Sequence, residues 1–337
     1  MSYDDAPHVV TWELTRACQL HCRHCRAQAI PRRHPQELTL DDMLPVLDDL
    51  ATQFERPPIL VFTGGDPLER PDLEAIIGQA VSRRLITALA PSVTPRLTPL
   101  VLQQWHDLGV HSVSLSLDGA DAPTHDKFRG VRNTFVRTVE MAHEVVRRGL
   151  ALQINTSVSR QTVEQIPAMA KLVEALGAQS WELFFVIPTG RARLQDTLGS
   201  QEIEEVLRWL TRFQPHRPMR VTTVGAPQWA RVRHEANPLE PPRVVAREAR
   251  GFAFIDHVGE VYPSGYLPVS GGNVRRTPFS AIYRHSPLFQ QLRDPDHLNG
   301  PCGHCAYRHE CGGSRARAYA VTQNLVASDP GCLRASG

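Results

Sequence analysis

The sequence predicts an α/β fold in which parallel strands alternate with helices from residue 8 to about residue 190. Short β-branched runs recur along this stretch, amphipathic segments separate them, and glycines follow the expected ends of several helices. Six strand–helix units in succession imply parallel strands joined by right-handed crossovers. A partial (β/α) barrel and a doubly wound open sheet both fit this pattern, and both carry their chemistry at the carboxyl ends of the strands.

The six strands are expected over residues 8–14, 59–63, 86–90, 112–117, 152–158 and 181–187. Thr39 precedes one helix and has the acidic Asp42 three positions on, which predicts a capping box. Thr98 precedes another helix and is followed by Pro99 at the first helical position. Apolar residues at helical spacing predict two more helices, over 133–148 and 163–176, each followed by a glycine.

After Gly190 the pattern changes. Residues 200–213 predict one helix, 214–247 form a connection rich in proline and arginine, and 252–261 predict a β-hairpin. We therefore expect three segments: a core over 1–195, a helical and linker connection over 196–248, and a small module over 249–337. The module has so little apolar periodicity that we expect it to need a bound metal for stability.

Composition excludes some classes of function. The 337 residues carry a formal net charge of +2, which predicts no strong attraction to nucleic acid or to an anionic membrane. No apolar run approaches the roughly 20 residues needed to cross a bilayer. The first residues are acidic and lack an apolar signal segment, so a cytoplasmic location is expected.

The seven cysteines form two groups that lie far apart in the sequence. One group comprises Cys18, Cys22 and Cys25, and the other comprises Cys302, Cys305, Cys311 and Cys332. An odd number, tight clustering and the expected cytoplasmic setting favour metal ligation over a disulfide framework.

The first group has the spacing C-x3-C-x2-C directly after the first predicted strand. Ordinary electron-transfer [4Fe–4S] clusters are closed by four cysteines, so three on a short loop would leave one iron open to an outside ligand. S-adenosylmethionine (SAM, also written AdoMet) can chelate such an iron through its amino and carboxylate groups. The alternative is a zinc site in which His21 or His24 completes the ligand set.

Further motifs make the chain resemble the radical SAM superfamily. Thr63-Gly64-Gly65-Asp66 after the second strand resembles the family's "GGE" motif, with Asp in place of the commoner Glu. The resemblance implies SAM contacts in this motif and in the later strands, at Thr63, Gly64, Gly65, Asp66, Ser116, Asp118, Arg129 and Asn155. It also implies that SAM is cleaved reductively to a 5′-deoxyadenosyl radical, with flavodoxin or ferredoxin as the reducing partner. The fold expected from it is a partial (β/α)6 TIM-like barrel with a small C-terminal iron–sulfur module.

The second group has the spacing C-x2-C-x5-C, and Cys332 follows after twenty residues. Four thiolates suit either a closed [4Fe–4S] cluster or a structural zinc ion, and the spacing alone does not separate them. The region resembles the auxiliary-cluster modules called SPASM or twitch domains. Serine occupies positions 264 and 314, where cysteine stands in some relatives, so we expect one auxiliary [4Fe–4S] cluster and not two.

Residues 262–275 and 311–320 resemble the radical SAM subgroup that contains the haem-biosynthesis enzymes. That resemblance implies hydrogen abstraction from a small molecule that bears a carboxylate, leading to decarboxylation or dehydrogenation. Candidate catalytic residues are Glu182, Tyr262 and Tyr266, with Trp12 and Glu13 as further substrate contacts. The alternatives are a maturase of ribosomally made peptides and a non-enzymatic zinc or iron–sulfur redox sensor.

Overall fold

The computed structural model describes residues 3–213, 216, 218–242 and 245–335. Within these residues, eleven strands form one sheet, ordered β11-β10-β9-β1-β2-β3-β4-β5-β6-β7, with β8 beside β9. The strands are β1 (Val9–Glu13), β2 (Ile59–Thr63), β3 (Thr87–Leu89), β4 (Ser112–Ser116), β5 (Ala151–Val158), β6 (Ser180–Phe185), β7 (Arg220–Val224), β8 (Arg247–Glu248), β9 (Gly251–Ile255), β10 (Glu260–Tyr262) and β11 (Gly272–Asn273).

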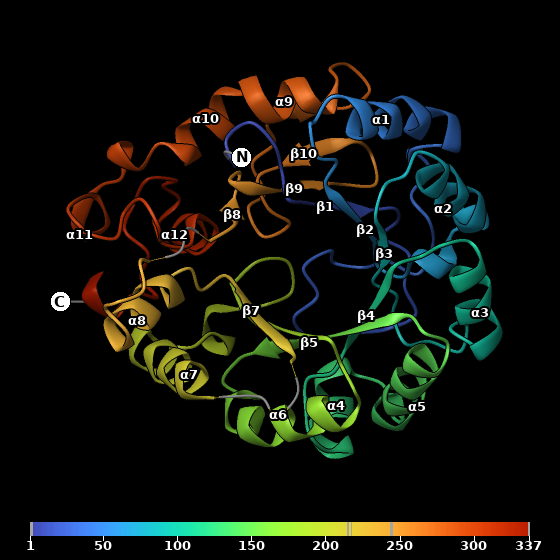
Figure 1. Ribbon diagram of the computed structural model, residues 1–337, viewed down its shortest axis with the longest axis horizontal. Helices are drawn as coiled ribbons and strands as arrows, with labels where there is room; N and C mark the ends of the chain where they lie inside the picture. Colours follow the sequence, from blue (N-terminus) through green and yellow to red (C-terminus); the bar gives the residue numbers. More distant parts are fainter. Residues whose placement is uncertain (1–2, 214–215, 217, 243–244, 336–337) are drawn as a thin grey trace.

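The strand order settles the choice between the two predicted architectures. From β1 to β7 each strand pairs in parallel with the next one in sequence, and the order never reverses. A doubly wound sheet requires such a reversal. The sheet instead curves around a central space with helices outside it (Figure 1). The predicted partial barrel is therefore confirmed.

The helices lie on the outside of the curved sheet (Figure 1). They are α1 (Leu40–Thr52), α2 (Leu73–Ser82), α3 (Pro99–Asp107), α4 (Ala122–Arg129), α5 (Thr134–Arg147), α6 (Ile166–Ala175), α7 (Ser200–Arg212), α8 (Trp229–Ala236), α9 (Phe279–His285), α10 (Pro287–Arg293), α11 (Gly300–Gly303) and α12 (Arg315–Thr322). The predicted capping box is present at α1, where the Thr39 side chain accepts from Asp42 N. Thr98 caps α3, and Pro99 is its first residue.

The structure contains several elements that the sequence did not predict. Strand β7 and helix α8 lie inside the expected connection, and β7 continues the barrel beside β6. Residues 220–224 are rich in β-branched side chains, which favour a strand. The prolines and arginines around them made this segment look like a connection instead. Residues 214–215, 217 and 243–244 of that connection lie outside the described residues. The segment boundaries at 195 and 248 stay predictions.

The C-terminal segment joins the barrel through its own strands. The predicted hairpin is confirmed as β9 and β10, which pair antiparallel. Strand β9 also pairs in parallel with β1, with Val9 opposite Phe252 and Trp12 opposite Ile255. Strands from the two ends of the chain are therefore direct neighbours within one sheet. Within the described residues, no helix has the length and apolar character needed to span a bilayer.

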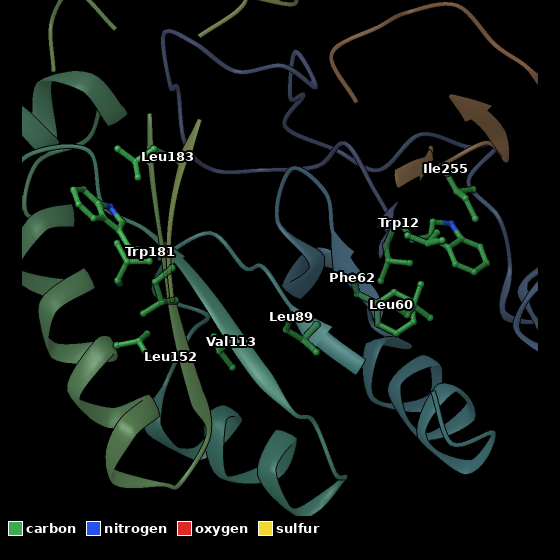
Figure 2. Close-up of a cluster of buried hydrophobic side chains, with 14 of the residues drawn as sticks. Trp12, Leu60, Phe62, Leu89, Val113, Leu152, Trp181, Leu183 and Ile255 are labelled. Carbon is green, nitrogen blue, oxygen red and sulfur yellow. The ribbon is translucent and has the colours of Figure 1, made fainter. Parts of the chain in front are cut away.

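Alternation along the strands separates the core from the inner face of the barrel. Successive side chains of a strand point to opposite faces of its sheet. Buried apolar side chains on one face pack against the helices (Figure 2), among them Trp12, Leu60, Phe62, Leu89, Val113, Leu152, Trp181, Leu183 and Ile255. On β4 these alternate with serines, which consequently face the barrel interior.

The expectation that Trp12 contacts substrate is wrong. Its side chain has no exposed surface and packs near Phe62, with ring centroids 6.3 Å apart (Figure 2). The residue lies on the core face of β1, opposite to its neighbour Glu13. Its large aromatic surface therefore stabilises the packing of β1 against the helices.

Replacing Trp12 with Ala should lower the free energy of unfolding by about 3–5 kcal/mol, because a fully buried aromatic side chain leaves a cavity. Chemical denaturation followed by circular dichroism measures this. Leu239→Ala is the control: that side chain is 95% exposed, so the change should stay within about 0.5 kcal/mol. Equal stability of the two variants would contradict the assignment of Trp12 to the core.

Candidate functional site

The first cysteine group lies on the loop that follows β1. All three thiols are unbridged, and two of them, Cys18 and Cys22, are buried. Cys18 Sγ accepts a hydrogen bond from the N–H two residues further on, and Cys25 Sγ accepts one from the N–H four residues further on, both at 3.4 Å. Arg129 Nη1 lies 3.8 Å from Cys22 Sγ and donates to it. Three unbridged sulfurs, each with a donor, fit three metal-bound thiolates.

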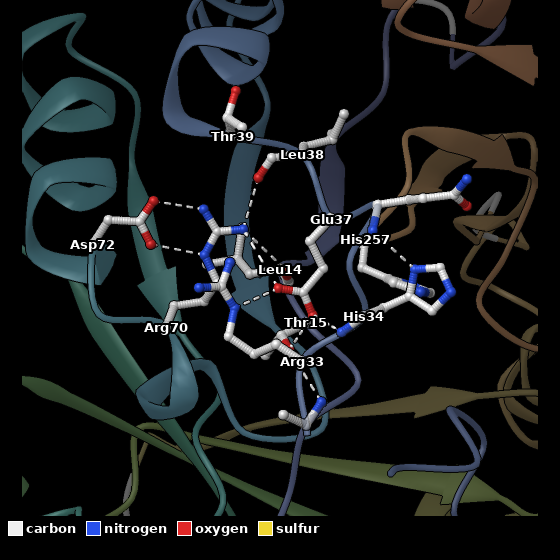
Figure 3. Close-up of polar contacts among 12 residues, drawn as sticks. Leu14, Thr15, Arg33, His34, Glu37, Leu38, Thr39, Arg70, Asp72 and His257 are labelled. Carbon is white, nitrogen blue, oxygen red and sulfur yellow. Dashed lines mark hydrogen bonds and ion pairs between the residues drawn. The ribbon is translucent and has the colours of Figure 1, made fainter. Parts of the chain in front are cut away.

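A buried polar network holds the start of this loop in place (Figure 3). Thr15 Oγ1 donates to Glu37 Oε1 at 2.5 Å, and Arg33 Nε donates to Glu37 Oε2 at 2.6 Å. Arg70 is ion-paired to Asp72 at 2.7 Å and donates from Nη1 to the Leu38 carbonyl at 2.8 Å. None of these contacts was predicted; two of them, Thr15 with Glu37 and Arg70 with Leu38, join residues far apart in the sequence.

The double glycine after β2 packs against the same loop. Gly65 N donates to Thr15 O and Asp66 N donates to Ala17 O, both at 2.7 Å. A Cβ on Gly65 would stand 2.4 Å from Ala17 O, and one on Gly64 would stand 2.5 Å from Thr15 O. The glycines are therefore needed for close approach to the protein's own cysteine loop, in addition to any cofactor contact.

A third loop, after β6, supports the far end of the cysteine loop. Gly190 has φ +67° and lies so close that a Cβ would stand 2.5 Å from the carbonyl oxygens of Cys25 and Arg26. Arg191 N donates to Cys25 O at 3.1 Å. The cysteine loop is thus enclosed by backbone from β2 and from β6.

Asp66 is fully buried beside Cys18. Its Oδ2 accepts from Thr94 Oγ1 at 2.9 Å, and its Oδ1 accepts from the backbone N–H groups of Leu68 and Ser92 at 3.2 and 3.4 Å. Burial raises the pKa of Asp66 to about 6. Ser92 Oγ also lies 3.4 Å from Cys18 Sγ. Ser92 and Thr94 were not predicted, because they follow the short strand β3 in a loop without a motif.

Asp118 and Arg129 form a buried ion pair next to Cys22. Arg129 Nη2 lies 2.5 Å from Asp118 Oδ2, and Ser157 N donates to Asp118 Oδ1 at 2.8 Å. Burial acts to raise the pKa of Asp118, but the Arg129 guanidinium, the neighbouring histidines and the Ser157 N–H together outweigh it and lower that pKa. His24 stacks on Phe128 with centroids 4.2 Å apart, and burial lowers its pKa to about 4, so it is neutral at pH 7. The Arg129 Nε–H is buried and donates to no described residue.

A row of polar side chains crosses the inner face of β4 to β7. Strand pairing places Ser116 beside Asn155, Asn155 beside Glu182, and Glu182 beside Thr222. Gln153 Nε2 donates to both Asn155 Oδ1 and Glu182 Oε2, at 2.8 and 3.0 Å. Burial raises the pKa of Glu182. The structure therefore brings three of the predicted site residues into one row inside the barrel.

Glu13 joins the cysteine loop to the C-terminal hairpin. Its carboxylate accepts from Arg26 Nη2 at 2.7 Å and lies 3.0 Å from His257 Nδ1. The Arg26 guanidinium lies over the Phe254 ring, 4.3 Å from its centroid. Arg26 follows Cys25 directly, and His257 lies in the turn of the predicted hairpin. Only the folded chain reveals that both contact β1.

A cavity of about 340 Å³ opens beside this network, between the cysteine loop and the hairpin. Tyr262 lines it and donates to Asp256 Oδ2 at 3.3 Å. Tyr266 does not line this cavity; with Phe184 it lines a second, smaller one, and burial raises the pKa of its hydroxyl to about 12. The wall of the larger cavity combines cationic, anionic, aromatic and aliphatic side chains, including Arg16, Arg26, Glu13, Asp256, Phe254, Tyr262 and Leu267.

The second cysteine group lies between α11 and the C-terminal residues. Cys305 Sγ and Cys311 Sγ each accept from the N–H two residues further on, at 3.4 Å, and Asp329 N lies 3.5 Å from Cys302 Sγ. Burial raises the pKa of Cys311 to about 12, and the charges of Cys332 and Cys302 add to that increase. The four thiols are thus gathered from both ends of the module. Across the described residues, no three or more Cys, His, Asp or Glu side chains are arranged to hold a single metal ion.

The two serines at expected cysteine positions make structural hydrogen bonds. Ser314 is fully buried, donates to Glu248 Oε1 at 2.9 Å and caps α12 by accepting from Arg317 N. Ser264 Oγ accepts from Tyr266 N at 3.1 Å. Both hydroxyls therefore organise the module through bonds to the chain itself.

Comparison with known proteins agrees with this geometry. Residues 12–173 match the family model of the radical SAM superfamily. The chain is 35% identical to the AdoMet-dependent heme synthase of Methanosarcina barkeri, over 99% of this chain and 98% of that protein. It is 36% identical to the AdoMet-dependent heme synthase of Nitratidesulfovibrio vulgaris, over 96% and 91%.

A solved structure supports the fold alone. The chain matches Streptococcus suis SuiB, crystallised with its precursor peptide SuiA, with a TM-score of 0.77 at 15% identity, over 98% of this chain and 76% of that one. The family match implies a radical SAM [4Fe–4S] cluster and SAM, and the C-terminal cysteines suggest an auxiliary cluster. The chain therefore belongs to the radical SAM superfamily, as a radical SAM enzyme homologous over its length to AdoMet-dependent heme synthase.

Proposed function

We propose that the protein decarboxylates propionate side chains of a tetrapyrrole, with an iron coproporphyrin as the substrate class. The observation that carries this proposal is the cavity beside Cys25, where Arg26 lies over an aromatic ring. A flat aromatic macrocycle bearing carboxylates requires both aromatic and cationic contacts. The similarity to AdoMet-dependent heme synthase supports the same class of substrate.

The residues of the first site fit the implied cofactors. Cys18, Cys22 and Cys25 would hold the [4Fe–4S] cluster, which together with SAM supplies a 5′-deoxyadenosyl radical able to take a hydrogen atom from a substrate. The unpartnered Nε–H of Arg129, next to Cys22, is available to the SAM carboxylate. Further SAM contacts are proposed at Thr63, Gly64, Gly65, Asp66, Ser116, Asp118 and Asn155.

Residues along the two cavities have complementary roles toward the substrate. Tyr266 keeps its proton at neutral pH, because its pKa is raised to about 12, so its hydroxyl can donate to a carboxylate. Glu182 lies further inside the barrel and is held by Gln153 and Thr222. It orients polar groups of the substrate, and its raised pKa suits the exchange of a proton. Tyr262 contributes an aromatic wall.

The proposed reaction requires an electron acceptor. A propionate that has lost a hydrogen atom from the carbon next to the ring becomes a vinyl group by losing CO2 and one electron. The acceptor for this electron is expected at Cys302, Cys305, Cys311 and Cys332, which would hold one auxiliary [4Fe–4S] cluster. A flavodoxin or ferredoxin would deliver the electron that starts each cycle at the first site.

Two other functions were considered from the sequence. A non-enzymatic redox sensor does not fit the homology to a synthase over the whole chain. A peptide maturase remains the competing radical reaction, because SuiB has the same fold and was solved with a peptide. The turnover experiment below separates it from the proposal.

Anaerobic reconstitution should load about eight irons with matching sulfide, roughly four at each cysteine group. Replacing Cys18, Cys22 and Cys25 together with Ala should leave about four irons and abolish formation of 5′-deoxyadenosine from SAM. Iron and sulfide assays with product chromatography measure both results. Stoichiometric zinc without sulfide in anaerobically purified protein would refute the iron–sulfur assignment.

Arg129→Gln should weaken SAM binding about ten- to hundredfold, because a charge-assisted hydrogen bond worth about 1.5–3 kcal/mol is lost. Titration of the reconstituted protein with SAM measures the dissociation constant. Arg132→Gln is the matched control, since this arginine is exposed on the loop that follows α4. Equal SAM affinity of both variants would show that Arg129 only pairs with Asp118.

Reconstituted protein given iron coproporphyrin III, SAM and a reductant should release CO2 and form vinyl groups, with the mass of formic acid lost for each propionate. Mass spectrometry measures this loss. Tyr266→Phe should reduce kcat/KM about tenfold while SAM affinity is kept, because only a donor to the substrate is removed. SAM cleavage that is stimulated by a precursor peptide and not by the tetrapyrrole would favour the maturase.

A further inference from the structure

Two buried arginines flank the second cysteine group. Arg247 belongs to the short strand β8, and Arg315 is the first residue of α12. Their exposed fractions are 5% and 0%. Charged side chains are rarely buried to this degree unless a partner compensates the charge.

Neither guanidinium uses all its donors. Arg315 Nη1 donates to the carbonyls of Leu325 and Ala327, at 3.2 and 2.6 Å, whereas its Nη2 has no partner among the described residues. Arg247 Nη1 donates to the Leu292 carbonyl at 3.1 Å, and both its Nε and its Nη2 lack a partner in the same part of the chain. Several N–H groups of these two cations are thus buried without an acceptor.

The neighbouring arginine of the same helix shows the contrast. Arg317 is also buried, and its Nε has no partner among the described residues, but it is ion-paired to Asp329 at 3.1 Å and donates to the Gly225 carbonyl. The carboxylate of Glu248, which follows Arg247, accepts from Ser314 and from the backbone of α12. Asp329 and Glu248 are therefore hydrogen-bonded to other groups of the chain.

The unpartnered donors lie beside the turn that follows Cys311. A Cβ on Gly312 would stand 2.9 Å from Arg247 Nη2. A Cβ on Gly313 would stand 2.6 Å from Arg315 Nη2 and 3.4 Å from Cys302 Sγ. Both glycines follow Cys311 and have positive φ, at +62° and +67°. The two guanidinium groups therefore reach the turn that carries Cys311, next to a second cysteine sulfur.

These observations fit an anionic group at the cysteines. Two buried positive charges without carboxylate partners are costly, and an uncompensated charge of this kind destabilises a folded chain strongly. A metal group bound by four thiolates carries net negative charge, and its sulfurs accept hydrogen bonds. Such a group would supply both the missing charge and the missing acceptors.

We propose that Arg247 and Arg315 donate to the cluster that the second cysteine group would hold, and that they raise its reduction potential. This inference rests on the proposed function, in which the substrate radical is oxidised by one electron and the cluster is reduced by one. Hydrogen bonds and positive charge near the sulfurs stabilise the reduced, more negative state. The two arginines are positioning residues, because they act through the cluster and not on the substrate.

The test measures the reduction potential of the second site directly. The full chain with Cys18, Cys22 and Cys25 replaced by Ala carries only the second cluster and is titrated anaerobically with spectroscopic detection. Arg247→Gln and Arg315→Gln should each lower the equilibrium constant for reduction about tenfold or more, equal to about 59 mV for a one-electron couple. Arg247→Lys, which keeps the charge, should recover most of the potential.

Arg293→Gln is the matched control. This partly buried arginine donates to the carbonyls of Ala249 and Tyr283. It also lies near Arg247 in the structure, because Arg247 donates to the carbonyl of its chain neighbour Leu292. The substitution should lower the melting temperature without changing the potential. Folded Gln variants that hold four irons at an unchanged potential would overturn the proposal. If the Arg315→Gln variant loses its iron, the potentials of Arg247→Gln and Arg247→Lys still test the proposal.

The proposed function and the proposed role of the two arginines can fail independently of each other. Redox-inactive zinc at the second site would overturn the role of the arginines, while turnover of iron coproporphyrin is scored by mass in a separate assay. Conversely, the reduction potential of the cluster can depend on Arg247 in a protein that acts only on a peptide. That result would support the role of the arginines and refute iron coproporphyrin as the substrate.

Discussion

Close backbone contact around the first cysteine loop is the constraint on which the rest of the site depends. The loop has no regular secondary structure, so its shape is imposed from outside. Gly64 and Gly65 support its first half, and Gly190 supports its second half, each at a distance that excludes a Cβ. Three thiols can be presented together only because backbone from β2 and β6 meets the loop at the carboxyl edge of the sheet.

Buried charge is the second organising feature. Glu13 with Arg26, and Asp118 with Arg129, pair within the barrel mouth, and each pair connects the cysteine loop to a different strand. Such pairs contribute little net stability, because desolvation offsets much of their attraction. Their value lies in orientation, since a paired guanidinium is held in one place and keeps donors for a bound anion. Arg247 and Arg315 at the second cysteine group lack such pairing, and the proposed anionic cluster would supply it.

The pairing of β9 with β1 joins the C-terminal module to the first cysteine loop. It places the C-terminal hairpin directly beside the strand that leads into the first cysteine loop. His257 in the hairpin turn thereby reaches Glu13, and Tyr262 and Phe254 form one wall of the cavity. The C-terminal module consequently forms part of the cavity in which we propose that the substrate binds.

The sequence by itself determined the parallel α/β order, the caps at Thr39 and Thr98, and the two cysteine groups, because each depends on residues close together in the chain. Barrel closure, strand β7 and the burial of Trp12 were decided by the tertiary structure. So were the partners of Glu13, Arg26 and Arg247. Register and side-chain pairing between distant segments depend on packing in three dimensions, and a local pattern shows that a side chain is polar but not which group compensates it.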